Sequence, residues 1–363
     1  MGNNDVRSQS LDLLRFPLAV TVLAVHVFST TGIIIGDSVC HDFLLKDVQC
    51  FVNVFLRGQS VPIYYFISGY VFFLGVDLTR RKYFDKLKNR VKTLLIPFLI
   101  FNVICILLSL LVAFARNMCI DGFTLKTFFS CFFAYDGKIP GTTGGLGLPI
   151  LGPTWFLRDL MVVVICTPLL NIVLKKNGCV SICLFALIWL WSRLLGFNIY
   201  MPCSALFFFS FGAYMSINKK DMIVEFGKVN RFSIILYSAL SLILIFLCTS
   251  NLFSSEIYVG VKSINIFLGL IVYFNLAVSL IKRGLCKVNK LLATSSFFIY
   301  ITHTMICGRL LKILFIVFSP QTSLSVLLCF IMAIILSVII LVYIYVLMKR
   351  YTPRLLTFVT GRR

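Results

Sequence analysis

Acidic residues are scarce in this sequence. Its 363 residues include only 13 Asp and Glu against 34 Lys and Arg, and charged residues of both signs make up 13% of the chain. Soluble domains carry about 25% charged residues, whereas this chain is 60% hydrophobic and has a mean hydropathy of +0.99. The composition therefore excludes an ordinary soluble domain and predicts a polytopic helical membrane protein.

Metal-binding motifs are missing. The chain has only three histidines, and neither a CxxC pair nor a His/Cys ligand spacing occurs, so we expect no metal site. The glycine-rich stretch 141–147 is not followed by a Walker lysine, which excludes a phosphate-binding loop of that kind. Internal repeats, which many transporters carry, are absent as well.

Cysteine is abundant, with 13 residues, but most of them lie within or beside apolar runs, where cysteine acts as a small hydrophobic residue. Two pairs near the predicted outer loops are alternatives for a disulfide, if that compartment is oxidising: Cys40 with Cys50, or Cys119 with Cys131. The sequence leaves open whether either pair forms.

Long apolar runs recur along the whole chain. A membrane-spanning helix needs about 20 apolar residues, and stretches that approach this length define about ten spans: 11–35, 52–76, 93–114, 154–174, 179–195, 202–217, 232–250, 261–281, 291–318 and 323–348. We therefore predict an all-α polytopic transmembrane helical bundle that forms a single integral-membrane domain over residues 1–363.

The basic residues follow this topology. Most of the 34 Lys and Arg lie in the segments before odd-numbered and after even-numbered spans. Because cytoplasmic loops carry the excess of Lys and Arg, both termini are predicted to be cytoplasmic. The positive charge is thus an orientation signal that also suits anionic lipid headgroups, and we expect membrane lipids rather than nucleic acid as partners.

The first apolar run contains three polar residues that are costly in a membrane, Asp12, Arg15 and His26. Ten residues separate Arg15 from His26, so the two lie within about 20° of each other around a helix axis and about 16 Å apart along it. We expect both to point into the protein, with Arg15 near a membrane surface and His26 near the midplane. A hydrogen bond from His26 to a neighbouring helix is the structural alternative.

A second polar face is predicted within residues 291–318. Ser296, Tyr300 and His303 recur at spacings of four and three residues, which places them on one side of a helix. Counted from the start of their spans at about 1.5 Å per residue, His303 and His26 lie at comparable depths.

Three further motifs contain candidate functional residues. The basic run that ends in NRVKTLLIP places Arg90 and Lys92 at the mouth of the third span, where cations suit a phosphate-bearing ligand. The second span contains a Ser-Gly pair that includes Ser68, and packing is the expected reason for its Gly69. The motif PTWFLRDL contains Trp155, for the membrane interface, and the adjacent charges of Arg158 and Asp159. We expect structural or substrate-orienting roles for five residues: Ser68, Trp155, Arg158, Asp159 and Ser296.

These elements together resemble acyltransferase family 3, a group of integral-membrane acyltransferases that includes bacterial O-acetyltransferases of lipopolysaccharide and other surface polysaccharides. The matching motifs follow in family order from about residue 11 to residue 348: LDLLRFPLAVTVLAVHVF, VPIYYFISGY, NRVKTLLIP, PTWFLRDL, FFFSFGAY and SFFIYITH. Two positions depart from the family pattern, because Thr93 stands where many members have a second arginine and Thr304 where proline is common.

The resemblance implies ten transmembrane helices and transfer of an acyl group, usually acetyl, from cytoplasmic acyl-CoA to a hydroxyl. The family's functional arginine and histidine map onto Arg15 and His26, and its basic residue before the third span maps onto Arg90. The expected location is the bacterial inner membrane, part of the cell envelope. Acyl-CoA is the expected donor substrate rather than a permanently bound cofactor, and a cell-surface or lipid-linked glycan is the expected acceptor.

Residue chemistry agrees with this reaction. Neutral imidazole is a suitable general base, so His26 is predicted to remove the proton from the acceptor hydroxyl. Arg15, Arg90 and Lys92 are predicted to bind the phosphates of acyl-CoA, while Tyr300 and His303 polarise the carbonyl oxygen or orient the acceptor. A covalent acyl-histidine intermediate is an alternative route. A glycan or anion transporter or flippase that uses the buried His and Arg as a relay is the alternative function, and an oligomer is compatible with the sequence.

Overall fold

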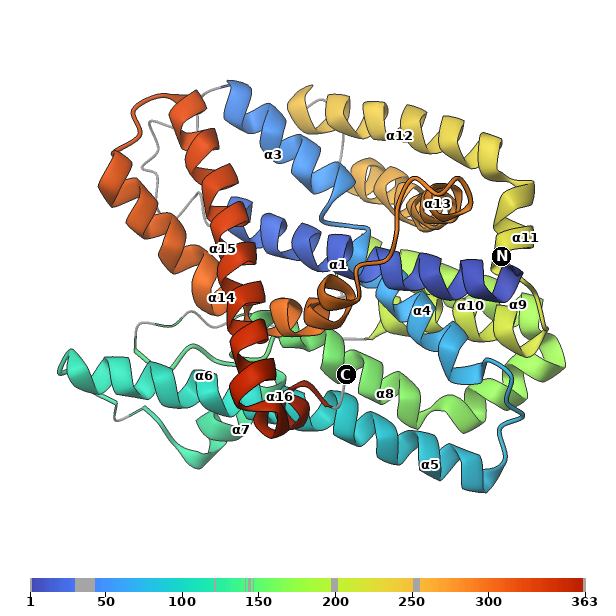
Figure 1. Cartoon of the computed structure of the whole chain (residues 1–363), viewed down its shortest axis with the longest axis horizontal. Helices are drawn as coiled ribbons and strands as arrows, with labels where there is room; N and C mark the ends of the chain where they lie inside the picture. The colour runs from blue at the N-terminus through green and yellow to red at the C-terminus, as the bar shows by residue number, and fades with distance from the viewer. Residues whose placement is uncertain are drawn as a thin grey trace. The chain divides into compact units, whose positions relative to one another are not determined.

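The structure, a computed structural model, describes residues 2–29, 43–120, 122–140, 142, 145, 147–196, 202–250 and 255–361. Helices and their connections account for all of these residues, and no strand occurs among them (Figure 1). The predicted all-α class is therefore confirmed.

Seven helices among the described residues are long and apolar enough to cross a membrane: Asn3–Phe28, Arg80–Ala115, Thr167–Leu194, Asn230–Cys248, Ser255–Lys282, Lys290–Phe318 and Ser323–Tyr351. A shorter apolar helix, α10, covers Cys203–Ile217. The chain is thus a multi-pass membrane protein, whereas the number of ten spans and the cytoplasmic termini stay predictions.

Two predicted spans are not single helices. The stretch 52–76 contains the end of α3 (Phe43–Phe55) and all of α4 (Ser60–Phe73), with a break between them. The stretch 154–174 contains α8 (Trp155–Ile165) and the start of α9 (Thr167–Leu194), which begins with a proline in its first turn. Proline lacks the amide hydrogen that a continuing helix would need, and it is tolerated in a first turn.

Helix α9 continues through the predicted loop between the fourth and fifth spans. It bends there, because Asn177 has non-helical backbone angles of φ −138° and ψ 52°. The predicted boundary between residues 174 and 179 thus corresponds to a kink within one helical segment.

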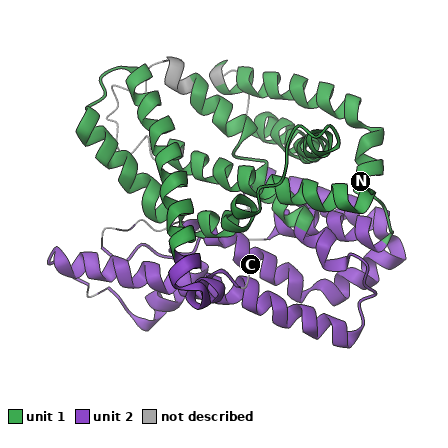
Figure 2. Cartoon of the chain, viewed as in Figure 1, with its two compact units in different colours: residues 1–67, 218–347 green, residues 68–217, 348–363 purple. Residues whose placement is uncertain are grey.

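The chain divides into two compact units, residues 1–67 with 218–347 and residues 68–217 with 348–363 (Figure 2). Two of the boundaries fall within α4 and α15, and the third follows directly after α10. The prediction of a single domain over 1–363 stays a prediction.

The first unit contains α3 and six further helices: α1 (Asn3–Ser29), α11 (Met222–Lys228), α12 (Asn230–Ser250), α13 (Ser255–Lys282), α14 (Lys290–Phe318) and most of α15 (Ser323–Tyr351). Helix α1 packs along α14 and α13, while α12 packs against α13 and α3 (Figure 1). The core of this unit is therefore built around α1.

A disulfide joins α3 to α12 through Cys50 and Cys248. Both sequence-based pairings are therefore wrong: Cys50 has a different partner, and Cys131 is a free thiol. Cys40 lies outside the described residues. The two predicted pairings join cysteines that are close along the chain, whereas 198 residues separate Cys50 from Cys248 and helix packing brings them together.

The second unit contains α8, α9, α10 and five further elements: α5 (Arg80–Arg90), the π-helical turn η1 (Val91–Leu95), α6 (Ile96–Ala115), α7 (Leu125–Phe133) and α16 (Pro353–Thr360). Helix α10 packs against α9 and α8, η1 contacts α8, and α16 packs on α6. The predicted packing role of Gly69 is confirmed, because a methyl group there would collide with the carbonyl of Phe209 on α10.

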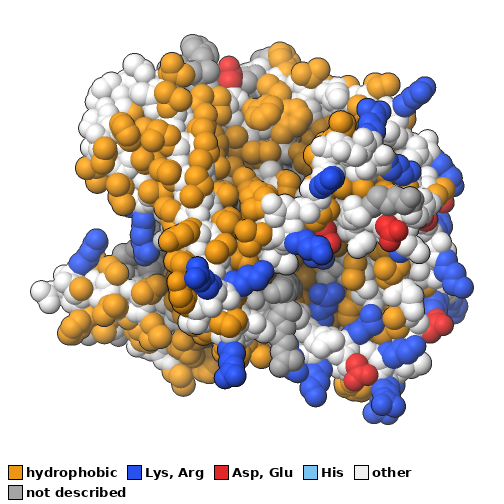
Figure 3. Space-filling view, viewed as in Figure 1, with side chains coloured by type: hydrophobic (Ala, Val, Ile, Leu, Met, Phe, Trp, Pro, Cys, Tyr) orange, Lys and Arg blue, Asp and Glu red, His pale blue; other side chains and the backbone are white. Residues whose placement is uncertain are grey.

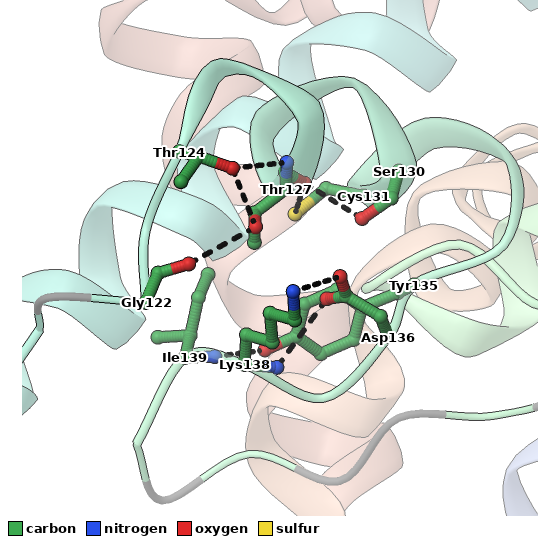
Figure 4. A network of polar contacts seen from close by, with 9 residues as sticks. All are labelled: Gly122, Thr124, Thr127, Ser130, Cys131, Tyr135, Asp136, Lys138 and Ile139. Carbon is green, nitrogen blue, oxygen red and sulfur yellow. Dashed lines mark hydrogen bonds and ion pairs between the residues drawn. The ribbon is translucent and has the colours of Figure 1, made fainter.

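A polar network holds the segment that contains α7 (Figure 4). The hydroxyl of Thr124 caps the helix by accepting a hydrogen bond from the amide of Thr127 at 3.2 Å. The buried hydroxyl of Tyr135 accepts one from the amide of Ile139 at 2.7 Å, and burial raises the pKa of this phenol. Hydrogen bonds from its own side chains thus stabilise this predicted outer connection.

Hydrophobic side chains cover the visible surface over α14 and α15 (Figure 3). On α15 they include several large exposed residues that recur at helical spacing: Leu324, Leu328, Ile331, Ile335 and Ile339. An exposed apolar row of this kind suits contact with lipid chains.

Candidate functional site

The packing of α1 against α14 brings two histidines together. The rings of His26 and His303 lie 5.0 Å apart between centroids and are tilted by 49°. The sequence predicts similar depths for these residues but contains no information on the distance between their helices. Their contact is therefore the central geometric result for the site.

His303 is completely buried, with 0% of its surface exposed. Its Nδ1 lies 2.7 Å from the backbone carbonyl oxygen of Tyr300, one turn earlier on α14. A carbonyl oxygen only accepts hydrogen bonds, so Nδ1 carries the hydrogen and, in the neutral ring, Nε2 carries the lone pair. Among the described residues, Nε2 has no hydrogen-bond partner.

Two tyrosines continue the polar face from His303 towards α4. The ring of Tyr300 lies 6.2 Å from that of His303, and the ring of Tyr64 lies 6.4 Å from that of Tyr300. The hydroxyl of Tyr64 donates a hydrogen bond of 2.6 Å to the backbone carbonyl of Arg15 on α1. Tyr64 was missed as a site residue, although it lies in the motif VPIYYFISGY.

The start of α4 is attached to α1 at a second point. The hydroxyls of Thr21 and Ser60 form a hydrogen bond, and the adjacent Gln59 donates to the side chain of Asn265 on α13 at 3.3 Å. These two bonds position the helix break between α3 and α4 beside the histidine-bearing part of α1.

Arg15 is not a buried residue. Its side chain is 46% exposed and forms a 3.0 Å ion pair with Asp12, which is 37% exposed. The pair shares one side of the helix because its members are three residues apart. Pairing with Asp12 and access to a polar boundary reduce the cost of this charge without burial.

Ser296 does not contribute a free polar group to the site. It is buried, and its hydroxyl donates a hydrogen bond of 2.8 Å to the carbonyl of Ala293 within the same helix. This contact satisfies the hydroxyl locally, so its geometry suits a structural role.

A group of cations lies in the second unit around the end of α4. Lys86 donates a hydrogen bond to the carbonyl of Phe72, and its ammonium group lies 4.9 Å from the centre of the Phe72 ring. The guanidinium carbon of Arg90 lies 5.9 Å from the same ring. Arg90 was predicted as a site residue and Lys86 was missed, although its spacing of four residues from Arg90 along α5 was the available signal.

Lys92 lies in η1, directly after Arg90. In a π-helical turn the backbone hydrogen bonds join residues that are five apart instead of four, and such turns are frequent at functional sites. Gly361, at the end of α16, packs against this turn, with backbone atoms of Thr93 close to where a Cβ would stand.

The other predicted residues of the second unit are held by structural contacts. Arg158 forms an ion pair of 2.9 Å with the buried Asp159, and it donates hydrogen bonds to the carbonyls of Phe133 and Gly147 at 2.6 and 2.7 Å. Arg158 thereby satisfies the end of α7 and fixes the following loop. Trp155 is half-buried at the start of α8.

Ser68 is also half-buried. Its hydroxyl oxygen has no hydrogen-bond partner among the described residues.

The described part of the chain contains no group of three or more His, Cys, Asp or Glu side chains that could hold a metal ion.

A family model described as an acyltransferase domain, that of acyltransferase family 3, matches residues 8–342. The match covers nearly the whole chain and includes both His26 and His303. Searches among curated proteins and among solved structures found no significant match.

Proposed function

The chain belongs to acyltransferase family 3, and from this premise we propose that it transfers an acyl group, acetyl in the first instance, from cytoplasmic acyl-CoA to a hydroxyl of a cell-surface or lipid-linked glycan. The acyltransferase class and the multi-pass membrane character follow from the family and the apolar helices. The donor, the acceptor and a location in the bacterial inner membrane with cytoplasmic termini are parts of the proposal.

The observation that carries the proposal is the contact between His26 and His303. An imidazole nitrogen removes the proton from the acceptor hydroxyl while the hydroxyl oxygen attacks the thioester carbonyl. When the carbon–sulfur bond breaks, the same proton passes to the sulfur of the leaving CoA. We assign the general-base role to His26, which is half-buried and so retains access for a substrate.

The proposed donor site uses the cations near the cytoplasmic ends of the helices. Arg15, Arg90 and Lys92 bind the phosphates of acyl-CoA, since forked guanidinium groups pair well with phosphate oxygens. Along α1, Arg15 and His26 are about 16 Å apart, which suits the length of an extended pantetheine arm. The thioester then reaches the histidines while the nucleotide part stays at the boundary.

Tyr300 and His303 complete the proposed site. Their rings lie beside each other on α14, and we assign them to the thioester carbonyl oxygen or to the orientation of the acceptor. Ser68, Trp155, Arg158, Asp159 and Ser296 support the site structurally or orient the acceptor.

The decisive experiment measures the transfer of labelled acetyl from acetyl-CoA by the purified protein in nanodiscs, together with the release of free CoA. We expect His26→Ala to lose more than about 99% of the wild-type rate, because general-base catalysis contributes roughly 10²- to 10⁴-fold. We expect Arg15→Ala to raise the KM for acetyl-CoA. His41→Ala is the matched control, since this histidine belongs to the predicted outer loop.

Wild-type activity in His26→Ala would contradict the assigned base. If the wild type neither binds nor cleaves acetyl-CoA but moves a glycan or an anion across the membrane, the transporter alternative replaces the acyltransferase proposal. A trapped acetyl-histidine, seen by mass spectrometry of the protein, would replace direct transfer with the covalent route.

A further inference from the structure

The unpartnered nitrogen of His303 requires an explanation. Buried polar groups are hydrogen-bonded in the great majority of cases, yet Nε2 of this fully buried ring has no partner among the described residues. The same ring is fixed on its other side by the 2.7 Å contact between Nδ1 and the Tyr300 carbonyl. The ring is therefore oriented, and one acceptor position on it is open.

The tautomer restricts what this position does. With the hydrogen on Nδ1, neutral His303 has no hydrogen on Nε2 and cannot donate a hydrogen bond to the oxygen of a thioester carbonyl. Of the two roles assigned above, stabilisation of the oxyanion is therefore excluded for neutral His303. The role of donor to that oxygen falls to the hydroxyl of Tyr300.

His26 needs an acceptor of this kind during the reaction. When it takes a proton from the acceptor hydroxyl it becomes an imidazolium with an N–H on each ring nitrogen. In the Ser-His-Asp arrangement a carboxylate stabilises this cation. On α1 the nearest acidic residue before His26 is Asp12, about four helical turns away and already paired with Arg15.

We propose that His303 is the positioning partner of His26: its Nε2 accepts a hydrogen bond from His26 in the transition state, with the Tyr300 carbonyl orienting His303 in turn. This inference rests on the proposed acyl transfer and extends it. The ring contact of 5.0 Å brings the two imidazoles close enough for a ring rotation to join them. The hydroxyl proton itself stays on His26 until it passes to the CoA sulfur, so His303 gains and loses no proton.

Three substitutions of His303 separate this role from simple packing. His303→Asn keeps a donor for the Tyr300 carbonyl but has no atom at the position of Nε2, whereas His303→Gln places an amide oxygen near that position. His303→Ala removes both groups. The readouts are kcat and KM for cleavage of acetyl-CoA with water as the acceptor, and the melting temperature in detergent.

We expect His303→Asn to lower kcat about 100-fold, the size of effect that misplacement of a catalytic group causes, with the KM for acetyl-CoA and the melting temperature close to wild type. His303→Gln should recover part of this loss, because an uncharged acceptor is enough to orient His26. In a His26→Ala background, His303→Asn should cause no further loss. A wild-type kcat in His303→Asn would overturn the inference.

The tautomer is measured independently of activity. The chain has only three histidines, so ¹⁵N-histidine labelling gives a spectrum that His26→Ala and His41→Ala assign by elimination. We expect His303 to be protonated at Nδ1, with a shift of its Nε2 signal in His26→Ala. Protonation at Nε2 would overturn the inference even if the acyltransferase reaction is found. Absence of acetyl-CoA cleavage by the wild type would instead overturn the proposed function on which the inference rests.

Discussion

At the scale of single residues, the ion pair between Asp12 and Arg15 is a contact that was not predicted. Both residues were noted as costly polar groups in the first apolar run, and their spacing of three residues was the signal that they meet on one helix face. Each charge considered alone gives no sign of this pair, whose side chains are 46% and 37% exposed.

This pair leads to a prediction about the donor site. A carboxylate beside Arg15 competes with phosphate oxygens for the guanidinium and repels their negative charge. We expect Asp12→Asn to lower the KM for acetyl-CoA by up to about fivefold, since an exposed ion pair is worth at most ~1 kcal/mol. Steady-state kinetics with varied acetyl-CoA measures the effect.

The control for this prediction is Asp136→Asn. Asp136 forms an ion pair as well, with Lys138, but it lies in the segment after α7. It should leave the KM unchanged. A higher KM in Asp12→Asn would show that Asp12 instead holds Arg15 in its binding orientation.

At the scale of the elements, close helix packing explains why a glycine stands at position 69. Gly69 of α4 faces the carbonyl of Phe209 on α10, and no space remains for a methyl group. In the predicted span 52–76 the Ser-Gly pair thus marks a contact between helices, while the real interruption lies earlier, between α3 and α4.

We predict that Gly69→Ala destabilises the protein by about 1–3 kcal/mol, because overpacking forces backbone shifts of that cost. The matched control is Gly260→Ala, whose added methyl group meets nothing within 4 Å and which gains helix propensity. The melting temperature in one detergent measures both. The packing argument fails if Gly69→Ala melts at the same temperature as Gly260→Ala or above it.

At the scale of the whole molecule, the disulfide between Cys50 and Cys248 bears on the orientation in the membrane. Disulfides persist in oxidising compartments. Independently, the distribution of Lys and Arg predicts that residues near 50 and 250 face the outer side. The two arguments use different residues and agree on cytoplasmic termini.

We therefore predict that peptide mass spectrometry of the unreduced protein finds Cys50 linked to Cys248, and that an impermeant reductant opens the bond in intact cells. Cys50→Ser and Cys248→Ser should remove the linked peptide equally. Cys131→Ser, at a free thiol, is the control. A bond that resists the reagent until the cells are lysed would reverse the predicted orientation.

The sequence by itself determined the class, the family and the helix faces. Hydropathy is a local property, so it predicts an all-helical membrane protein, and six short motifs in order predict the family that the match over residues 8–342 confirms. Helical periodicity likewise places Tyr300 and His303 on one face of α14. The functions assigned to these residues stay predictions until the kinetics are measured.

Only the tertiary structure decided which residues meet. The contact of His26 with His303, the bond from Tyr64 to Arg15 and the pairing of Cys50 with Cys248 each join helices that are distant along the chain. Helix–helix packing depends on the shapes of entire faces rather than on the composition of one segment. The tautomer of His303 likewise follows from a distance to a backbone oxygen, which spacing alone does not reveal.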